Sequence, residues 1–511
     1  MGYAKTYAVA LVGISGHVIE VEADISQALP GFVLLGLPDT ALNEAKDRVR
    51  SAAKNSGKPL PPQKLTINLT PARLPKRGTG FDLAIVVAAL QAAKLLQPSG
   101  RTVFLGELGL DGSVRPIPGV LPAARAAWEA GFESVVVPEH NANEARLISG
   151  LEVRGVSCLA EVLTLLGADT EQLRFPSSSS TRPGSEDEAV PLMPADMADV
   201  AGQEEGRLAL EIAAAGAHHL LFNGPPGSGK TMLAERLPGI LPPLSTDQAL
   251  EVTAIHSISS RGAPRTQLMR YAPFEAPHHT ASAAALMGGG SGIPQPGCVS
   301  RAHRGVLFLD EAPEFHRNVL DSLRQPLESG SVTLDRSTAS ATYPARFQLV
   351  LAANPCPCGK NSGRGLECTC TSKERRTYFS RLSGPLLDRI DLHITVPQVS
   401  AAELTSTGSH EPSQPIRERV VQAREKQRER LADFGVLTNA ETNGKILRGK
   451  LKLPATMTQS LSRAVDRGAL TARGYDRVLR TAWTIADLEG AESPRSDHLD
   501  LALYFRNMSR T

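Results

Sequence analysis

Short apolar runs of the kind that form β-strands alternate with helical patterns along much of the chain. Within residues 1–170 the strand-like runs are 9–12, 32–37, 65–69 and 134–137, and residues 81–96 have a helical period. Farther along, the runs 220–223, 306–309 and 347–353 alternate with helical stretches, an order typical of a mostly parallel sheet between helices. From residue 416 onward nearly all of the pattern is helical. These patterns predict an α/β protein of several domains with a helical C-terminal region.

Two polar stretches divide this pattern into domains. Residues 175–188 are rich in Ser, Pro and charged residues and contain almost nothing apolar to bury, so we expect a linker there. A second stretch at 406–414 is rich in Ser, Thr, Gly and Pro. We therefore predict a first domain at 1–170, a linker at 171–190, a second domain at 191–400 and a C-terminal domain at 401–511.

Charge and hydropathy limit the cellular compartment and the binding partners that we expect for this protein. The 511 residues include 55 Lys and Arg and 53 Asp and Glu, a net charge of +2, so any contact with nucleic acid or anionic lipid must be local. The longest apolar run, 83–90, is far shorter than the roughly 18 to 20 residues that cross a bilayer. The first residues lack the pattern of a signal peptide. We therefore expect a cytoplasmic protein without a membrane partner.

Residues 224–231 fit the spacing G-x-x-x-x-G-K-[ST] of a phosphate-binding loop between a predicted strand and a helical stretch. Glycines at this spacing let backbone N–H groups curl around phosphate oxygens at the start of a helix. Lys230 is expected to reach the terminal phosphates of ATP, and Thr231 to hold Mg²⁺. The predicted nucleotide-binding residues are Gly224, Pro225, Pro226, Gly227, Ser228, Gly229, Lys230 and Thr231.

The two following apolar runs end in polar residues suited to nucleotide hydrolysis. The first is followed by Asp310, which we expect to help hold Mg²⁺, and by Glu311, which is placed to polarise the attacking water. The second ends at Asn354, whose amide suits either a sensor of the γ-phosphate or a simple strand-end cap. Arg389 lies between two acidic residues and suits either a surface ion pair or an arginine that reaches a neighbouring subunit's phosphate.

Four of the six cysteines fall between positions 356 and 370. Four thiolates are enough for a closed tetrahedral Zn²⁺ site, and such a site leaves no open position for catalysis. The clustering therefore predicts a structural zinc rather than a catalytic one. The alternatives are four unrelated thiols and, more weakly in a cytosolic chain, disulfides. The predicted ligands are Cys356, Cys358, Cys368 and Cys370.

The order of these motifs resembles that of the AAA+ ATPases of the magnesium-chelatase-like group. Over essentially the whole chain, further stretches resemble the ComM/YifB family: Asp199-Val200-Ala201-Gly202-Gln203, His218-His219-Leu220-Leu221, Ala276-Pro277-His278-His279-Thr280 and Asn354-Pro355-Cys356-Pro357-Cys358-Gly359. The resemblance implies an N-terminal domain like that of Lon protease, of the ribosomal S5 domain 2-like type, then a central AAA+ P-loop NTPase domain and a helical C-terminal lid. It also implies a homo-hexameric DNA helicase that drives branch migration on single-stranded or branched DNA during natural transformation.

The same resemblance assigns roles to residues outside the phosphate loop. It makes Arg389 an arginine finger that acts on the neighbouring subunit, and it suggests Arg473 as a second sensor, with Arg477 as a rival. The segments 273–290 and 327–343 correspond to insertions that line the pore of such a ring. Candidates for contact with DNA are therefore His278, His279 and Arg336, although paired histidines are more often structural and a single Arg on a hairpin is often merely solvated.

The first domain resembles a Lon protease domain that has lost its chemistry. Thr79 and Gly80 stand where the serine nucleophile would lie, and residues 121–123 stand where the lysine would be. No base is left to activate a hydroxyl, so peptidase activity is disfavoured. Lys76 and Arg77 are candidates for contact with phosphate, or form an exposed pair that is simply solvated.

Three functions therefore compete at this point. The first is an ATP-hydrolysing motor that acts on DNA, with ATP and Mg²⁺ as cofactors and a structural Zn²⁺ as a third. The second is a motor subunit that inserts Mg²⁺ into a porphyrin, which shares the central motifs but does not need the Lon-like domain. The third is a nucleotide-gated scaffold or chaperone, and stimulation of ATP hydrolysis by DNA distinguishes it from the DNA motor.

Overall fold

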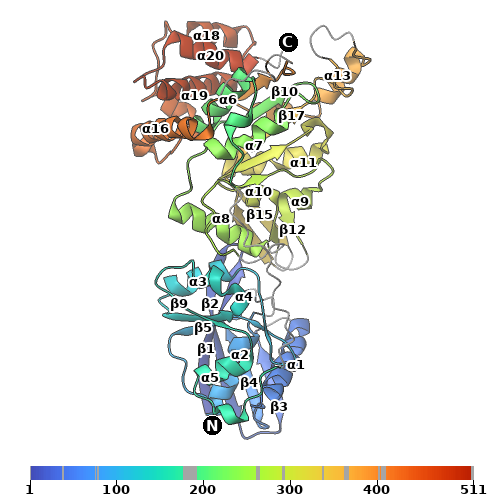
Figure 1. The fold of residues 1–511 in the computed structure, drawn as a ribbon, viewed down its shortest axis with the longest axis vertical. Helices are drawn as coiled ribbons and strands as arrows, with labels where there is room; N and C mark the ends of the chain where they lie inside the picture. The colour runs from blue at the N-terminus through green and yellow to red at the C-terminus, as the bar shows by residue number, and fades with distance from the viewer. Residues whose placement is uncertain are drawn as a thin grey trace.

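The computed structural model has an N-terminal α/β region at one end, a central sheet in the middle and C-terminal helices at the other end (Figure 1). The structure describes residues 2–36, 39–74, 76, 80–176, 193–259, 265–290, 294–336, 339–361, 367–400, 403 and 410–507. The predicted linker lies outside the described residues from 177 onward, and so does the 406–409 part of the second polar stretch.

The N-terminal region is built on a mixed seven-stranded sheet in the order β3-β4-β2-β1-β5-β8-β9. β1, β2 and β4 pair antiparallel, whereas β3 runs parallel to β4, and β5, β8 and β9 continue parallel to β1. The strands are β1 (Gly2–Val12), β2 (Ser15–Ser26), β3 (Gly31–Leu35), β4 (Lys64–Thr70), β5 (Thr102–Phe104), β8 (Ser134–Pro138) and β9 (Glu152–Val156), with β6 (Glu107–Leu108) and β7 (Val114–Arg115) as a separate pair. The helices are α1 (Asp39–Asn55), α2 (Asp82–Ala92), α3 (Val120–Glu129), α4 (Glu139–Ala145) and α5 (Leu159–Leu165).

Two elements of this region have different bounds in the structure from those that the sequence predicts. The run at 9–12 is only the end of β1, because the first half of that strand mixes partly exposed polar positions with buried ones and so lacks a continuous apolar run. The helical pattern at 81–96 ends at Ala92, because Lys94 adopts a left-handed backbone conformation with φ 59°. Every residue of α2 is buried, which makes this helix the centre of the N-terminal core.

The central region contains a parallel sheet, as the sequence predicts, and this sheet has five strands. The order is β11-β14-β17-β10-β18, and every neighbouring pair is parallel. The strands are β10 (Leu220–Asn223), β11 (Phe274–Glu275), β14 (Val306–Leu309), β17 (Gln348–Ala353) and β18 (Leu392–Thr395). All residues of β14 and β17 are buried, because helices cover both faces of the sheet. The apolar runs therefore mark the central strands, whereas the short β11 and β18 carry no such signal.

Helices and two small hairpins surround this sheet. The helices are α6 (Glu204–Gly216), α7 (Lys230–Ile240), α8 (Thr246–Ile258), α9 (Ala283–Met287), α10 (Cys298–Arg301), α11 (Arg317–Ser322), α12 (Arg324–Ser329), α13 (Ser372–Phe379) and α14 (Gly384–Leu387). One hairpin pairs β12 (Gly288–Gly289) with β13 (Gln295–Pro296), and the other pairs β15 (Ser331–Arg336) with β16 (Ala339–Pro344). The second hairpin accounts for most of the predicted 327–343 insertion.

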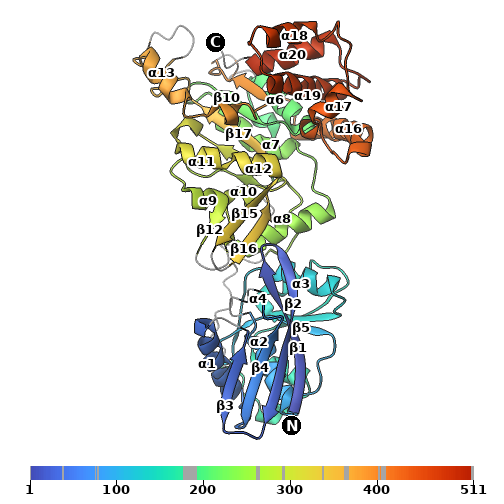
Figure 2. The ribbon, with the colours of Figure 1, turned by 180° about the vertical axis from the view of Figure 1, so that it is seen from behind.

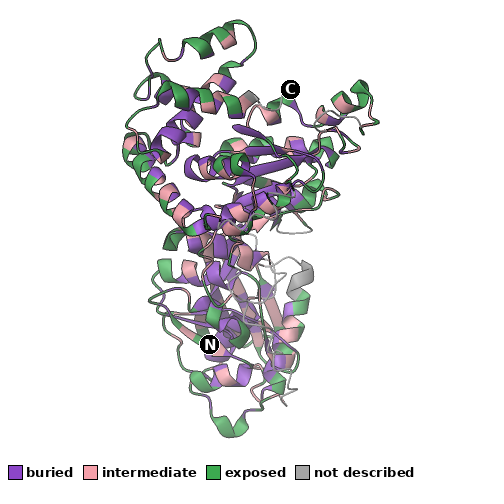
Figure 3. Cartoon of the chain, turned by 45° about the horizontal axis from the view of Figure 1, so that its top comes forward, coloured by how far each residue is buried: buried purple, intermediate pink, exposed green. Residues whose placement is uncertain are grey.

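The C-terminal region is helical, as predicted. Its helices are α16 (Ser413–Leu431), α17 (Gly444–Arg448), α18 (Gln459–Asp466), α19 (Ala472–Leu488) and α20 (Ser496–Asn507). These helices share one hydrophobic core with the central sheet, in which Val420 of α16 and Val478 of α19 are buried together with Phe222 of β10. In Figure 3 the buried residues run from the sheet into the inner faces of these helices.

The N-terminal region also contacts the central one. Ala254 of α8 is buried in the same apolar cluster as Val9 and Leu121, and the N–H of Gly119 donates to the carbonyl oxygen of Ser257 at 3.2 Å. The turn between β1 and β2, at Gly13, lies against the backbone of Thr342 in β16. Figure 2 shows β15 and β16 between the two regions. Among the described residues, none of the helices is long and apolar enough to cross a membrane.

A buried ion pair ties the C-terminal helices to the sheet. Asp391, just before β18, is 2% exposed and accepts a hydrogen bond of 2.5 Å from Arg477 of α19. Its other oxygen accepts from the backbone N–H of His219 at 3.1 Å. Burial alone would raise the pKa of Asp391, but Arg477 and the nearby His218 outweigh that effect and hold the pKa well below its usual value.

We predict that Asp391→Ala strongly destabilises the protein, because it leaves Arg477 buried without its partner. Loss of one partner of a buried pair costs about 3–5 kcal/mol, which corresponds to a fall in melting temperature of about 10 °C. Asp388→Asn is a matched control, since Asp388 is one third exposed and lies 4.0 Å from the exposed Arg473. Thermal unfolding followed by circular dichroism measures both, and an unchanged melting temperature for Asp391→Ala would contradict the prediction.

Candidate nucleotide-binding site

The phosphate-binding loop connects the end of β10 to the start of α7. Gly227 and Gly229 have φ values of 76° and 92°, in the left-handed region that side chains disfavour. Gly224 also has no room for a side chain, because a Cβ there would lie 2.3 Å from the carbonyl oxygen of Val396. The loop therefore bends sharply into the N-terminus of α7, where backbone N–H groups provide an anion site.

Lys230 is fixed at the mouth of this loop. Its Nζ donates to the carbonyl oxygens of Gly224 at 2.7 Å and Pro225 at 2.9 Å, and to Oδ1 of Asn354 at 3.2 Å. Burial lowers the pKa of Lys230, while the nearby Asp310 and Glu311 oppose that shift. The hydrogen bond to Asn354 joins the phosphate loop to the end of β17, so two of the sequence-predicted residues are in direct contact.

Thr231 and Asp310 form a second contact between α7 and the end of β14. The Thr231 hydroxyl donates to Oδ2 of Asp310 at 2.9 Å. A hydroxyl and a carboxylate are hard oxygen donors of the kind that Mg²⁺ prefers, and they lie beside the loop that would hold the phosphates. The donor set therefore fits a magnesium ion.

Glu311 has an unusual backbone and a partner that the sequence analysis missed. Its φ is 49°, a left-handed conformation that costs a non-glycine residue about 1–3 kcal/mol. Its Oε2 lies 3.2 Å from Nδ1 of His279. The rings of His278 and His279 are in contact, with their centroids 4.1 Å apart and their planes tilted by 34°. The contact with Glu311 arises because β11 runs parallel to β14 in the register Phe274 to Val306, which brings the residues after both strands to the same edge.

Tyr378 of α13 is a further residue that the sequence analysis missed. It is 3% exposed, and burial raises its pKa to about 12. A hydrogen bond with the backbone of Asn354 acts in the opposite direction. Tyr378 therefore packs directly against the residue that contacts Lys230.

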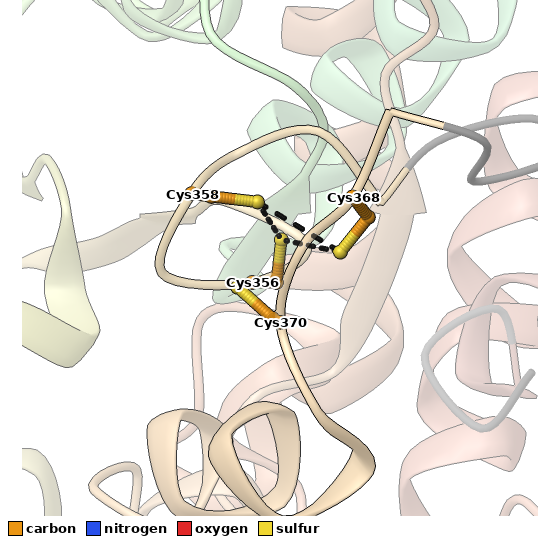
Figure 4. Close-up of side chains that lie close together, drawn as sticks. All are labelled: Cys356, Cys358, Cys368 and Cys370. Carbon is orange, nitrogen blue, oxygen red and sulfur yellow. Dashed lines mark hydrogen bonds between the residues drawn. The ribbon is translucent and has the colours of Figure 1, made fainter.

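The four clustered cysteines lie together between Asn354 and α13 (Figure 4). All four sulfur atoms are within 4.8 Å of one another, and Sγ of Cys356 lies 3.3 Å from that of Cys358 and 3.7 Å from that of Cys368. Hydrogen bonding from the backbone of Lys360 lowers the pKa of Cys358 to about 6. Four sulfur donors at this spacing fit a tetrahedral zinc site.

The loop that carries these cysteines also touches the phosphate loop. Gly359, with φ 74°, lies against Pro226, and a side chain at 359 would come within 2.6 Å of the proline ring. The cysteine cluster is therefore attached to the nucleotide site on two sides, through Pro226 and through the Asn354 end of β17.

The arginines predicted from the family resemblance gather elsewhere. A cavity of about 220 Å³ is lined by Leu327, Glu328, Asp388, Arg389, Arg473, Asp476, Arg477 and Arg480. Arg389 forms an ion pair with Glu328 and donates to the carbonyl oxygen of Pro385 at 2.6 Å. Burial lowers its pKa, and the neighbouring arginines Arg324, Arg473 and Arg477 add to the shift. In the part of the chain that the structure describes, no hydrogen bond or ion pair joins this cavity to Lys230 or Asp310.

The two rivals for the second sensor differ in their surroundings. Arg477 is 14% exposed and is held by Asp391, as described above. Arg473 is 70% exposed and has Asp388 at 4.0 Å as its ion-pair partner. Arg473 is therefore the residue of the two whose guanidinium faces solvent.

The predicted DNA-contacting residues come from two segments of the central region, the one that follows β11 and the end of β15. His278 is exposed and its Nδ1 lies 2.9 Å from the Thr280 hydroxyl, while Arg336 is exposed at the end of β15.

In the N-terminal region the prediction that Lys76 is an exposed phosphate contact or part of an exposed basic pair is wrong. This residue is 2% exposed and donates to the carbonyl oxygen of Pro71 at 2.5 Å. Arg77 and Thr79 lie outside the described residues.

Three regions of the chain match known protein families. Residues 196–404 match the family described as magnesium chelatase, subunit ChlI, and residues 410–506 match the C-terminal family of the same subunit. Residues 21–141 match a further family described as subunit ChlI of Mg-chelatase. The parallel sheet and phosphate loop thus define a magnesium-chelatase-type AAA domain, and such a domain implies an ATPase.

Similar proteins span the whole chain. The chain is 48% identical over 508 residues to Rv2897c of Mycobacterium tuberculosis, which covers 99% of both chains. It is 42% identical to YifB of Salmonella typhimurium and 41% identical to competence protein ComM of Haemophilus influenzae, each over 513 residues, 100% of this chain and 98% of the relative. The chain therefore belongs to the ComM/YifB family of magnesium-chelatase-like proteins.

A partial similarity concerns a protease. The chain is 29% identical over 167 residues to Lon protease of Mycolicibacterium smegmatis, a match that covers 30% of this chain and 21% of the protease. This similarity does not extend to the whole of either protein.

Proposed function

We propose that this protein is an ATP-driven motor that assembles as a homo-hexamer and moves branched or single-stranded DNA, as in branch migration during natural transformation. The observation that carries the ATPase part is the pair of contacts from Lys230 to Asn354 and from Thr231 to Asp310 across the edge of one parallel sheet. Support for the DNA part comes from the full-length similarity to a relative named as a competence protein.

Each residue of the site has a role in this proposal. The loop from Gly224 to Thr231 binds the phosphates, with Lys230 reaching the β- and γ-phosphates. Thr231 and Asp310 hold Mg²⁺, which neutralises charge on the phosphate oxygens. Glu311 polarises the attacking water, and Asn354 orients that water beside the γ-phosphate.

In a ring, a second subunit completes the site. Arg389 acts as the arginine finger on the nucleotide of the neighbouring subunit, and Arg473 acts as the second sensor. Both line the same cavity, and its cluster of arginines suits a phosphate supplied by another chain. His278, His279 and Arg336 are the proposed contacts with DNA in the pore.

We further propose the domain division 1–170, 171–190, 191–400 and 401–511, with a first domain like that of Lon protease and of the ribosomal S5 domain 2-like type. The mixed sheet of the N-terminal region and the partial similarity to Lon protease support this division. The absence of a serine at Thr79 or Gly80 and of a lysine at 121–123 supports a non-peptidase role for the domain.

A magnesium-chelatase motor subunit is the second candidate, because the matching family models carry that description. It would hydrolyse ATP with the same residues but would not respond to DNA. A nucleotide-gated scaffold would not respond to DNA either. Stimulation of ATP hydrolysis by DNA therefore distinguishes the DNA motor from both alternatives.

We predict that single-stranded or four-way-junction DNA stimulates ATP hydrolysis by the purified protein severalfold.

Glu311→Gln should lower the turnover rate about 100-fold or more while nucleotide affinity stays within about threefold, because the change removes a base and not a phosphate contact. Lys230→Ala should weaken nucleotide binding at least about tenfold. An unchanged rate with DNA would contradict the DNA motor, and an active Glu311→Gln would overturn the role of Glu311.

The arginine finger predicts a specific complementation. Arg389→Ala should be nearly inactive, and adding Lys230→Ala subunits should restore part of its activity, since they supply Arg389 to an intact neighbouring phosphate loop. The Lys230→Ala/Arg389→Ala double variant is the control and should restore nothing. Absence of recovery in mixed rings that are verified by co-purification would exclude an action of Arg389 on the neighbouring subunit.

We also propose that the four clustered cysteines hold a structural Zn²⁺. Metal analysis of the purified protein should give about one zinc per chain. Cys368→Ala should remove the zinc and lower the melting temperature, whereas Cys298→Ala, outside the cluster, should keep the zinc. A wild-type protein that contains no zinc, together with a Cys368→Ala variant whose melting temperature equals that of the wild type, would contradict this proposal.

A further inference from the structure

The side chain of Arg389 is held within its own chain. It is 12% exposed and forms an ion pair with Glu328 of α12, whose side chain is 64% exposed. The Nη1 of Arg389 also donates to the carbonyl oxygen of Pro385 at 2.6 Å. A guanidinium that acts on a phosphate of the neighbouring subunit has to leave such contacts and point away from its own chain. The pairing with Glu328 therefore competes with the proposed task of Arg389.

The stability of α12 does not explain why a glutamate stands at position 328. Glu328 lies in the last turn of that helix, where the partial negative charge of the helix C-terminus disfavours a carboxylate. The surroundings of Arg389 do explain it. Burial lowers the pKa of Arg389, and three neighbouring arginines lower that pKa further, so a nearby anion stabilises its charged form.

The cavity around this ion pair is short of negative charge. Four arginines and three acidic residues line it. Arg477 is neutralised by the buried Asp391, and Asp476 by Arg448, which lies outside the cavity lining, at 2.9 Å. Three arginines and two acids remain. One of these arginines, Arg480, has a buried Nε without a hydrogen-bond partner in the part of the chain that the structure describes. The cavity, of about 220 Å³, therefore suits a further anion.

We propose that Glu328 is a positioning residue that takes, in a subunit outside the ring, the place beside Arg389 that a terminal phosphate of the neighbour's ATP takes in the ring. This inference rests on the proposed function, since it assumes that Arg389 acts on the neighbouring subunit. A guanidinium binds carboxylate and phosphate oxygens through the same kind of charge-assisted hydrogen bond, so one anion can replace the other. Arg389 is thus paired in both states, and ATP on the neighbour favours its release from Glu328.

The first test follows ATP hydrolysis as a function of protein concentration. Glu328→Gln removes the competing charge and keeps the size of the side chain, so the protein concentration that gives half-maximal activity should fall about two- to fivefold. At saturating protein, kcat and KM for ATP should stay within about twofold of the wild type. The melting temperature should change by no more than about 2 °C, because residue 328 is exposed. A purely structural role would instead lower activity at every protein concentration.

Glu411→Gln is the matched control for this measurement. Glu411 is also an exposed glutamate that pairs with an arginine, Arg419, at 2.6 Å. Arg419 keeps Glu211 as a second partner, at 2.6 Å, when Glu411 is changed. The half-maximal protein concentration of Glu411→Gln should therefore equal that of the wild type.

Binding of inorganic pyrophosphate gives a readout that needs neither a ring nor hydrolysis. The titrations use Lys230→Ala protein, in which binding at the phosphate loop is weakened. Adding Glu328→Gln to this protein should tighten pyrophosphate binding about two- to fivefold, because the carboxylate no longer competes for the arginines. Adding Arg389→Ala as well should remove that gain. Isothermal titration calorimetry measures all three proteins.

The possible outcomes separate this inference from the proposed function. If mixed rings show that Arg389 acts on the neighbouring subunit but Glu328→Gln changes neither the concentration dependence nor pyrophosphate binding, the role of Glu328 is overturned while the arginine finger stands. If mixed rings show no complementation, the arginine finger fails, and tighter pyrophosphate binding that depends on Arg389 still supports competition between Glu328 and a phosphate. A higher half-maximal concentration for Glu328→Gln would overturn the inference, because Glu328 would then help to hold the ring together.

Discussion

The parallel pairing of β10, β14 and β17 is the constraint on which the nucleotide site depends. Because the strands run in one direction, the residues that follow them meet at one edge of the sheet. Lys230 thereby reaches Asn354, and Thr231 reaches Asp310, although more than 75 residues separate each pair in the sequence. These side chains are hydrogen-bonded to one another, so the donors and acceptors of the site are gathered at this edge before a nucleotide binds.

The C-terminal helices stabilise this sheet and also supply the arginines beside it. α19 carries Arg477, which is buried against Asp391, and one turn earlier it carries the exposed Arg473. The buried ion pair fixes the helix relative to β18, and this anchorage sets the direction in which Arg473 points. Residues with structural and proposed catalytic tasks thus share one helix, and the position of Arg473 depends on the stability of the Asp391 contact.

Local sequence patterns predict the parts of the structure that depend on local chemistry. The phosphate loop, the acids after β14 and the four cysteines are each contained in a short stretch, so spacing alone identifies them. The contact of His279 with Glu311 is different, because it follows from a two-residue strand with no apolar run and from its register beside β14. The burial of Lys76 depends on tertiary packing in the same way, and an isolated basic pair in the sequence does not reveal it.

The cysteine loop completes the set of elements that bear on Asn354. The residue lies between Lys230 on one side and Tyr378 on the other, and the cysteines connect β17 to the helix that carries this tyrosine. A metal ion at the cysteines would close that connection into a rigid loop, and Gly359 presses the same loop on Pro226. Since Asn354 and Pro226 both belong to the proposed nucleotide site, the cluster would help to fix one relative to the other although none of its sulfur atoms needs to touch the nucleotide.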